Sequence, residues 1–222
     1  MKNKKFNIAI VGLGNIGLYL YDHLNKNKKI IKEKTNTDLE IKYVSARNKL
    51  KKRRFKIPKY KWLMNYSDAY KKDDIDIVIE LIGGSEGPAK KLVFNSIKNG
   101  KHVITANKAL ISKYGDQLAL IAEKNKVNLE YEAAVAGGVP IIRVLKEGLI
   151  ANKIEKIYGI LNGTSNYILS NMNKYSLDFK SVLNKAKSLG YAETNPKYDL
   201  NGEDVKSKIQ ILSALAFNSF IN

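Results

Sequence analysis

The chain begins with a short apolar segment, a glycine-rich turn and a helix-forming segment in immediate succession. Residues 6–11 read FNIAIV and predict a buried strand; residues 12–17 read GLGNIG and precede the helical pattern LYLYDHL. A G-x-G-x-x-G turn between a strand and a helix is typical of a site for a dinucleotide, whose pyrophosphate lies at the start of the helix. The first glycine allows the tight turn, the second lets backbone approach the pyrophosphate, and the third lets helix and strand pack closely. The candidate cofactor-binding residues in this turn are Gly12, Gly14, Asn15, Ile16 and Gly17.

Strand and helix patterns alternate along the chain that follows. Strands are predicted over residues 39–46, 74–83, 101–106 and 127–134, helices over residues 86–99 and 114–125, and a loop within residues 25–38. This alternation predicts an α/β domain with a doubly wound parallel sheet, in which ligands bind at the carboxyl ends of the strands. Arg47, Gly83, Lys108 and residues 135–140 all fall at such ends. We therefore expect them to share one site with the glycine-rich turn.

The end of the second predicted strand indicates which dinucleotide is bound. An acidic residue there would bind the ribose hydroxyls of NAD. Residues 45–48 instead read SARN, with no acid and with Arg47, and more basic residues follow. A guanidinium at this place suits a 2′-phosphate, so the sequence favours NADP, with NAD as the alternative. Most of the other basic side chains in residues 49–61 are expected to be a solvated loop.

The pattern changes near residue 135, and we predict two domains, residues 1–135 for the dinucleotide and residues 136–222 for the substrate. In the second domain we expect a helix at residues 141–150, a strand at residues 153–161, a helix capped by residues 162–166, and a helix at residues 178–189. Residues 189–208 then concentrate acidic and basic side chains before an apolar helix. Asp204 and Lys208 lie four apart, at the edge of the stripe formed by Ile211 and Leu215. Charges at the edge of a core cost desolvation, which indicates a substrate site, although an ordinary surface ion pair has the same spacing.

Composition limits the class of protein. The net charge of +18 raises the possibility of nucleic-acid binding, but the lysines are dispersed and no aromatic residues alternate with them in a stacking pattern, so we expect no nucleic-acid partner. No apolar run reaches the length of a membrane-spanning helix, so we expect no membrane partner. The chain has no cysteine, which excludes disulfides and thiolate sites and fits a cytoplasmic protein.

Six motifs resemble the homoserine dehydrogenase family in order and spacing. They are GLGNIG, IELIGG, TANKAL, EAAVAGGVPII, GILNGTSNYIL and GYAETNPKYDLNGEDVKSK, and they extend over residues 7–217. The last three are the most specific, because other dehydrogenases share the first. The resemblance implies a Rossmann-type fold followed by an α+β substrate domain, which is incomplete here. It also implies NAD(P)-dependent interconversion of L-homoserine and L-aspartate 4-semialdehyde, on the route to threonine, methionine and isoleucine.

The resemblance also implies roles for individual residues. Lys208 matches the family's catalytic lysine, and a lysine ammonium can supply the proton that an aldehyde needs during hydride transfer. Lys108 is similar to the lysine between nicotinamide and substrate. The other residues that match positions near the substrate are Thr164, Tyr191, Glu193, Asp199 and Asp204.

The segment EAAVAGGV resembles the family's loop for a monovalent cation such as Na⁺. The implied ligands are the Glu132 side chain and the backbone carbonyls of Val135, Gly137 and Val139. Such an ion would order the connection between the domains, away from hydride transfer.

The resemblance has one departure. The chain ends at Asn222, inside or just after the helix that contains Lys208, whereas homoserine dehydrogenases usually continue. A single strand at residues 153–161 cannot form a stable sheet by itself. We therefore expect a part of a longer protein, a homodimer when full length, with poor stability and little activity in this shorter form.

Three other functions stay open from the sequence. The chain could be another Rossmann-type dehydrogenase acting on an amino acid or a semialdehyde. It could be a basic nucleic-acid-binding protein, with strongly salt-dependent retention on DNA. It could also be a nucleotide sensor without catalysis, in which Lys208 has no chemical role.

Overall fold

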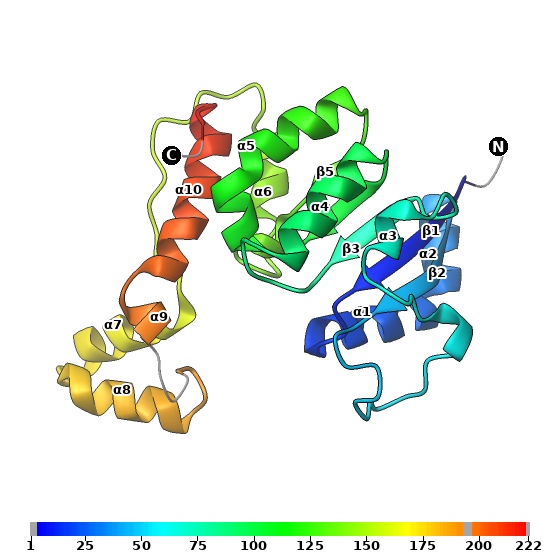
Figure 1. Cartoon of the computed structure of the whole chain (residues 1–222). Helices are drawn as coiled ribbons and strands as arrows, with labels where there is room; N and C mark the ends of the chain where they lie inside the picture. The colour runs from blue at the N-terminus through cyan, green and yellow to red at the C-terminus, as the bar shows by residue number, and fades with distance from the viewer. Residues whose placement is uncertain (1–3, 193–196, 221–222) are drawn as a thin grey trace. The chain divides into compact units, whose positions relative to one another are not determined.

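The computed structural model describes residues 4–192 and 197–220 (Figure 1). The chain divides into two compact units, Met1–Gly137 and Gly138–Asn222. This division lies two residues after the boundary expected from the sequence. Among the helices of the described residues, none combines the length and the apolar character needed to cross a membrane.

The first unit is built on one sheet. Its described strands are β1 (Lys4–Val11), β2 (Thr37–Ser45), β3 (Ile77–Glu80), β4 (His102–Thr105) and β5 (Leu129–Glu130). All neighbouring pairs are parallel, and the order is β2-β1-β3-β4-β5. From β1 the chain adds β2 on one side and β3 on the other, so the strand order reverses between β1 and β3. The predicted doubly wound parallel sheet is confirmed.

Helices cover both faces of this sheet, and the side-chain alternation of β1 explains why. Ile8 and Ile10 face a cluster that includes Tyr21 of α1 (Asn15–Lys26). Ala9 and Val11 face the opposite cluster, which includes Ala69 of α3 (Asp68–Lys71) and Leu92 of α4 (Pro88–Lys98). Successive side chains of a strand point to opposite faces, so an almost continuously apolar strand is buried on both sides. The other helical segments of this unit are α2 (Lys28–Thr35), η1 (Lys59–Lys61), α5 (Lys108–Lys124) and η2 (Glu132–Ala134).

Two predictions for the first unit were wrong. Residues 25–38 were expected to hold the end of the first helix and a loop. Helix α1 does end at Lys26, but Lys28–Thr35 is a second helix, α2, with no fully buried side chain and with Asn36 in the left-handed conformation after it. Its helix-forming lysines, with Lys29 and Glu33 one turn apart, favour helix without an apolar stripe. The fifth strand was expected over residues 127–134, but only Leu129–Glu130 pairs with β4. The strand ends there because the Ala134 N–H bonds to the Tyr131 carbonyl, 2.9 Å away, and closes the η2 turn.

The regular secondary structure of the second unit, in its described residues, is helical. They are α6 (Ile141–Arg143), the π-helical turn η3 (Val144–Gly148), α7 (Gly163–Tyr175), α8 (Phe179–Ser188), α9 (Lys197–Leu200) and α10 (Glu203–Phe217). Ile168 of α7 packs with Val182 and Ala186 of α8 in one apolar cluster. Ile211 and Leu212 are buried on α10, and this helix contacts η3.

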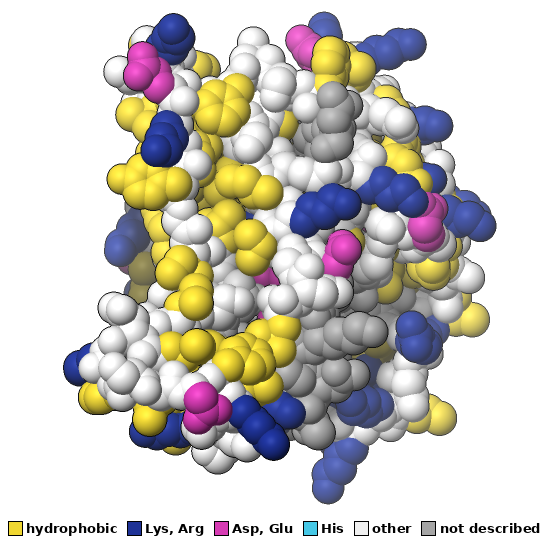
Figure 2. Space-filling model, turned by 90° about the vertical axis from the view of Figure 1, so that its left-hand side faces the viewer, with side chains coloured by type: hydrophobic (Ala, Val, Ile, Leu, Met, Phe, Trp, Pro, Cys, Tyr) yellow, Lys and Arg dark blue, Asp and Glu magenta, His cyan; other side chains and the backbone are white. Residues whose placement is uncertain are grey.

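The strand predicted at residues 153–161 is not formed. This segment has no regular secondary structure and no strand partner among the described residues. A strand needs a neighbour for its backbone groups, and the described part of this unit provides only helices. Tyr158 and Ile160 of this segment are 85% and 53% exposed, and Figure 2 shows exposed hydrophobic side chains gathered on the face that it views.

Candidate functional site

The glycine-rich turn joins β1 to α1 and depends on two of its glycines for packing. Gly12 has φ +110°, and a Cβ there would lie 2.3 Å from the carbonyl oxygen of Leu81. A Cβ on Gly17 would lie 2.0 Å from the carbonyl oxygen of Gly12. Both distances are far too short for contact between non-bonded atoms. Gly12 and Gly17 are therefore required by the fold itself.

Gly14 differs from these two glycines. A Cβ built on it meets no atom within 4 Å, and its φ of −76° is open to any residue. It is the N-cap of α1, where no side chain caps the helix, and Ile16 in the first turn is 64% exposed. A helix start whose N–H groups have no intrahelical partners, with space beside the backbone, is suited to a phosphate. The turn thus fits a bound dinucleotide at the place predicted from the sequence.

A pocket of about 160 Å³ lies beside this turn. It is lined by Ile16 after β1, by residues 80–83 at the end of β3, and by Ala106 and Asn107 after β4. These are carboxyl ends of strands, next to the position where the strand order reverses, and ligands bind there in open α/β sheets. Gly83, a candidate cofactor-binding residue from the sequence, lines this pocket. Lys108 is the first residue of α5, directly after Asn107, and is partly buried.

Glu80 was missed by the sequence analysis, although it lines the same pocket. It is completely buried at the end of β3. Its carboxyl group accepts hydrogen bonds from the N–H groups of Ile82 and Gly83 and from the Thr105 hydroxyl, at 2.7, 2.9 and 2.6 Å. The available signal was an acidic residue at the end of a strand that is otherwise apolar.

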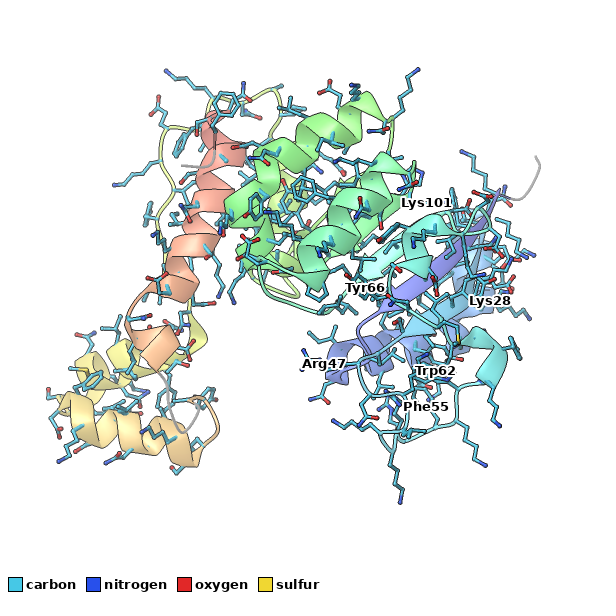
Figure 3. The ribbon with its side chains drawn as sticks, in the orientation of Figure 1. Lys28, Arg47, Phe55, Trp62, Tyr66 and Lys101 are labelled. Atoms are coloured by element: carbon cyan, nitrogen blue, oxygen red, sulfur yellow. The ribbon has the colours of Figure 1, made fainter. Side chains whose placement is uncertain are left out.

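Arg47 lies just beyond β2, at the carboxyl edge of the sheet (Figure 3). Its side chain is exposed and has no ion pair or hydrogen bond within residues 4–192 and 197–220. Arg53 of the same loop, by contrast, is held in place. Its guanidinium donates to the carbonyls of Asn48, Lys49 and Lys51, and its Cζ lies 4.9 Å from the ring centre of Trp62. Only part of the basic loop is thus available to a ligand.

In the second unit, Asn162 brings two carboxyl groups together. It precedes α7 and is buried, and its Oδ1 accepts a hydrogen bond from the N–H of Ser165, which caps the helix. Its Nδ2 lies 3.0 Å from Oδ1 of Asp199 and 3.0 Å from Oδ2 of Asp204. An amide nitrogen has two hydrogens, so one side chain can serve both acids. The sequence analysis took Asn162 only as a helix cap.

Lys208 completes this group of polar side chains. Its Nζ lies 2.7 Å from Oδ2 of Asp204, one helical turn earlier on α10, and 2.7 Å from the carbonyl oxygen of Leu161. The side chains of Lys208 and Asp204 are only 17% and 6% exposed. The predicted position of the pair at the edge of the buried face is confirmed. An ammonium has three hydrogens, and the bonds of Lys208 within the described residues use two of them, which leaves one for a ligand.

Two further predicted residues belong to the same group. The Thr164 hydroxyl lies 2.6 Å from the Tyr191 carbonyl oxygen and 3.2 Å from Oδ2 of Asp199. Tyr191 stacks on Tyr167, with ring centres 4.6 Å apart, and is 57% exposed. Within the described residues, Asn162 thus holds the carboxyl groups of Asp199 and Asp204 near the amine of Lys208. Carboxyl oxygens grouped in this way favour a ligand that carries a cation. Glu193 lies outside the described residues.

The candidate cation ligands are divided between the units. Glu132, Val135 and Gly137 belong to the first unit and Val139 to the second. The donors are all oxygen atoms, which suits a hard cation. The Val139 carbonyl accepts a hydrogen bond from the Ile141 N–H at 2.8 Å, so one of its lone pairs is already used. Within the described residues, no three His, Cys, Asp or Glu side chains cluster as a metal site would require.

Comparison with known proteins identifies relatives for both units. The family profile described as "Homoserine dehydrogenase, NAD binding domain" matches residues 12–132, and the profile "Homoserine dehydrogenase" matches residues 140–222. The chain is 42% identical over 219 residues to the homoserine dehydrogenase of Neisseria gonorrhoeae, covering 99% of this chain and 50% of that protein. It thus spans about half the length of the curated relatives that it matches.

Solved structures of homoserine dehydrogenases also resemble this chain. The crystal structure of a homoserine dehydrogenase from Thiobacillus denitrificans matches with a TM-score of 0.87 and 41% identity, over 99% of this chain and 50% of that one. A hyperthermophilic archaeal homoserine dehydrogenase in complex with NADPH shares the fold, with a TM-score of 0.79 and 23% identity, over 97% of this chain and 70% of that one.

Proposed function

This chain belongs to the homoserine dehydrogenase family, and from that premise we propose that it forms the catalytic part of an enzyme that interconverts L-homoserine and L-aspartate 4-semialdehyde. The observation that carries the proposal is the buried group around Asn162, in which Lys208 is bonded to Asp204 and one donor hydrogen remains. Amino-acid substrates bring an ammonium, and the carboxyl oxygens of Asp199 and Asp204 are suited to bind it.

Lys208 acts on the oxygen at the reacting carbon. In the reducing direction, its third N–H hydrogen bonds the aldehyde oxygen and is donated as the alkoxide forms; in the oxidising direction, the neutral amine takes the hydroxyl proton. Asp204 and the Leu161 carbonyl hold the amine in one orientation, because each accepts one of its hydrogens. A bound nicotinamide dinucleotide supplies the hydride in reduction and accepts it in oxidation.

We infer NADP as the preferred cofactor, with NAD as the alternative. The support is the exposed guanidinium of Arg47 beyond β2, where no acidic residue is present to bind a ribose 2′-hydroxyl. The pyrophosphate would lie at Gly14 and the first turn of α1. A homoserine dehydrogenase of the same fold has been solved in complex with NADPH, which supports a nicotinamide dinucleotide in this site.

Four further statements remain predictions. These are Na⁺ or a similar cation at Glu132, Val135, Gly137 and Val139, a homodimeric assembly, a cytoplasmic location, and the absence of a nucleic-acid partner. Glu193 also keeps its predicted place near the substrate.

The test is homoserine-dependent reduction of NADP⁺ by the purified protein, followed by nicotinamide absorbance. Reactions without homoserine, or with L-serine or L-alanine in its place, are the controls. Turnover with homoserine alone supports the proposal. Equal rates with all three amino acids would favour a broader amino-acid dehydrogenase. DNA binding that weakens steeply with salt, in a protein without turnover, would favour the nucleic-acid alternative.

A further inference from the structure

Glu80 joins the ends of two strands through hydrogen bonds of its buried carboxyl group. One oxygen accepts from the N–H groups of Ile82 and Gly83, directly after β3. The other accepts from the hydroxyl of Thr105, the last residue of β4. The side chain therefore fixes the turn after β3 relative to the neighbouring strand.

The network continues to the start of α5. The Thr105 hydroxyl oxygen accepts from the Asn107 N–H at 3.0 Å. The Asn107 amide donates to the Gly84 carbonyl at 2.7 Å, and its oxygen accepts from the Leu110 N–H at 3.1 Å, which caps α5. The turn that starts at Glu80 and the helix that starts at Lys108 are thus connected by a closed set of hydrogen bonds.

The location of this network gives it a functional meaning. It forms the wall of the pocket at the ends of β3 and β4. In a doubly wound sheet with the pyrophosphate at the turn after β1, the adenosine half extends toward β2. In this sheet β3 and β4 lie on the other side of β1, so the nicotinamide half extends toward the Glu80 network.

A structural role alone does not require a carboxyl group here. Burying a polar carboxyl group costs free energy that a well-packed apolar side chain would not, so stability alone would be served by an apolar residue. What a carboxyl group adds is a defined position for the backbone of Ile82 and Gly83. Gly83 and Gly84 both have φ of +83°. Glycine can adopt many other conformations, so hydrogen bonds are needed to hold the turn in this one.

We propose that Glu80 is a positioning residue for the nicotinamide half of the cofactor, acting through the backbone of residues 82–84 and through Asn107. The inference rests on the proposed function, because it presumes a nicotinamide dinucleotide in this site.

The test compares two ligands on the full chain. NADPH has the nicotinamide half, and 2′-phospho-ADP-ribose has the adenosine half and the pyrophosphate but no nicotinamide. Glu80→Ala is expected to weaken NADPH binding by about tenfold, since the hydrogen bonds that hold the turn after β3 are lost, and to leave 2′-phospho-ADP-ribose binding unchanged. Glu80→Gln keeps an acceptor for Ile82 and Gly83 and is expected to restore most of the affinity. Thr105→Val, which removes only the bridging hydroxyl, is expected to cause a smaller loss confined to NADPH.

The outcomes separate this inference from the proposed function. If the unaltered chain binds neither ligand, the proposed function fails and the inference fails with it. If it binds both, and the Glu80→Ala and Thr105→Val variants lose both ligands equally or neither, only the inference is refuted. A role limited to folding would change both affinities together, so the ratio of the two dissociation constants is the decisive measurement.

Discussion

The ammonium of Lys208 and the carboxylate of Asp204 lie 2.7 Å apart, one turn of α10 from each other, and both are largely shielded from solvent. An exposed ion pair at this spacing contributes only about 0.3–0.5 kcal/mol to helix stability. This pair differs because the Asn162 amide and the Leu161 carbonyl also bond to it. The positions of both groups are fixed by contacts from outside their own helix.

Lys208→Ala is expected to reduce kcat by about 10²–10⁴-fold, which is the usual contribution of a general acid. The affinity for NADPH is expected to stay unchanged, because the cofactor-binding turn is elsewhere in the chain. Lys206→Ala is the matched control, since Lys206 is an exposed lysine on the same helix. Steady-state rates and NADPH titrations give both values. Unimpaired turnover in Lys208→Ala would refute its catalytic assignment, whereas NADPH binding without turnover in both the wild type and the variant would favour the nucleotide-sensor alternative.

Asp204→Ala is expected to lower the free energy of unfolding by about 3–5 kcal/mol, because it leaves the Lys208 ammonium buried without its partner. Glu203→Ala, at the exposed neighbouring position, is expected to have little effect. Urea denaturation measures the difference. The double variant Asp204→Ala/Lys208→Met should regain much of the loss, and a double variant whose loss is simply additive would contradict this account.

Gly14→Ala and Gly17→Ala are expected to separate cofactor binding from folding. The methyl group at Gly14 enters open space, so stability stays unchanged while NADPH affinity falls about tenfold or more, since backbone can no longer approach the phosphate. The methyl group at Gly17 collides with the Gly12 carbonyl and lowers stability by about 1–3 kcal/mol. Thermal unfolding and NADPH titration of both variants test this. Equal destabilisation by the two substitutions would be inconsistent with the packing described.

Arg47→Ala is expected to raise the dissociation constant for NADPH about tenfold to a hundredfold and to leave that for NADH unchanged, because only NADPH carries the 2′-phosphate. Lys52→Ala removes another exposed cation from the same loop and serves as the control for overall charge. An equal loss of affinity for both cofactors, or none for either, would show that Arg47 does not bind the 2′-phosphate.

Glu86 is expected to make stability depend on pH in the acid range. Hydrogen bonds from Lys113 and from the Tyr114 hydroxyl, with a further one from Lys90, lower its pKa from 4.5 to about 2. Because the pKa of Glu86 is lower in the folded state than in the unfolded state, its carboxylate stabilises the fold above pH 4.5. That stabilisation is lost as the pH falls toward 2. The free energy of unfolding should therefore fall more steeply between these pH values in the wild type than in Glu86→Gln. Glu33→Gln is the control, and parallel slopes for wild type and Glu86→Gln would contradict the prediction.

The elements of the first unit were largely predictable because their signals are local. The apolar runs of β1, β3 and β4 and the glycine turn at residues 12–17 depend on neighbours in sequence. The strand at residues 153–161 was wrongly predicted because a strand also needs a partner, which sequence pattern does not show. Helix α2 was missed because it has no fully buried side chain, and thus no apolar periodicity.

The contacts of the candidate site are likewise of two kinds: local contacts, which sequence spacing predicts, and long-range contacts, which it does not. The spacing of Asp204 and Lys208 on one helix was sufficient to predict their contact. Asn162 lies 42 residues before Asp204, and Glu80 lies 25 residues before Thr105, so these bonds exist only once the chain has folded. Residue types alone could not reveal that an amide bridges two acids, or that a carboxyl group holds a turn.

The contacts of Arg53 have a consequence for altering the choice of cofactor. Because Arg53 binds three carbonyls of its own loop and stacks on Trp62, the loop after β2 is held largely by its own contacts rather than by the glycine turn. Residues around Arg47 can therefore be exchanged for acidic ones while Arg53, Trp62, Gly12 and Gly17 are kept. Under the proposed function, this loop is the place where substitutions would change a preference for NADP into one for NAD at the least cost to the fold.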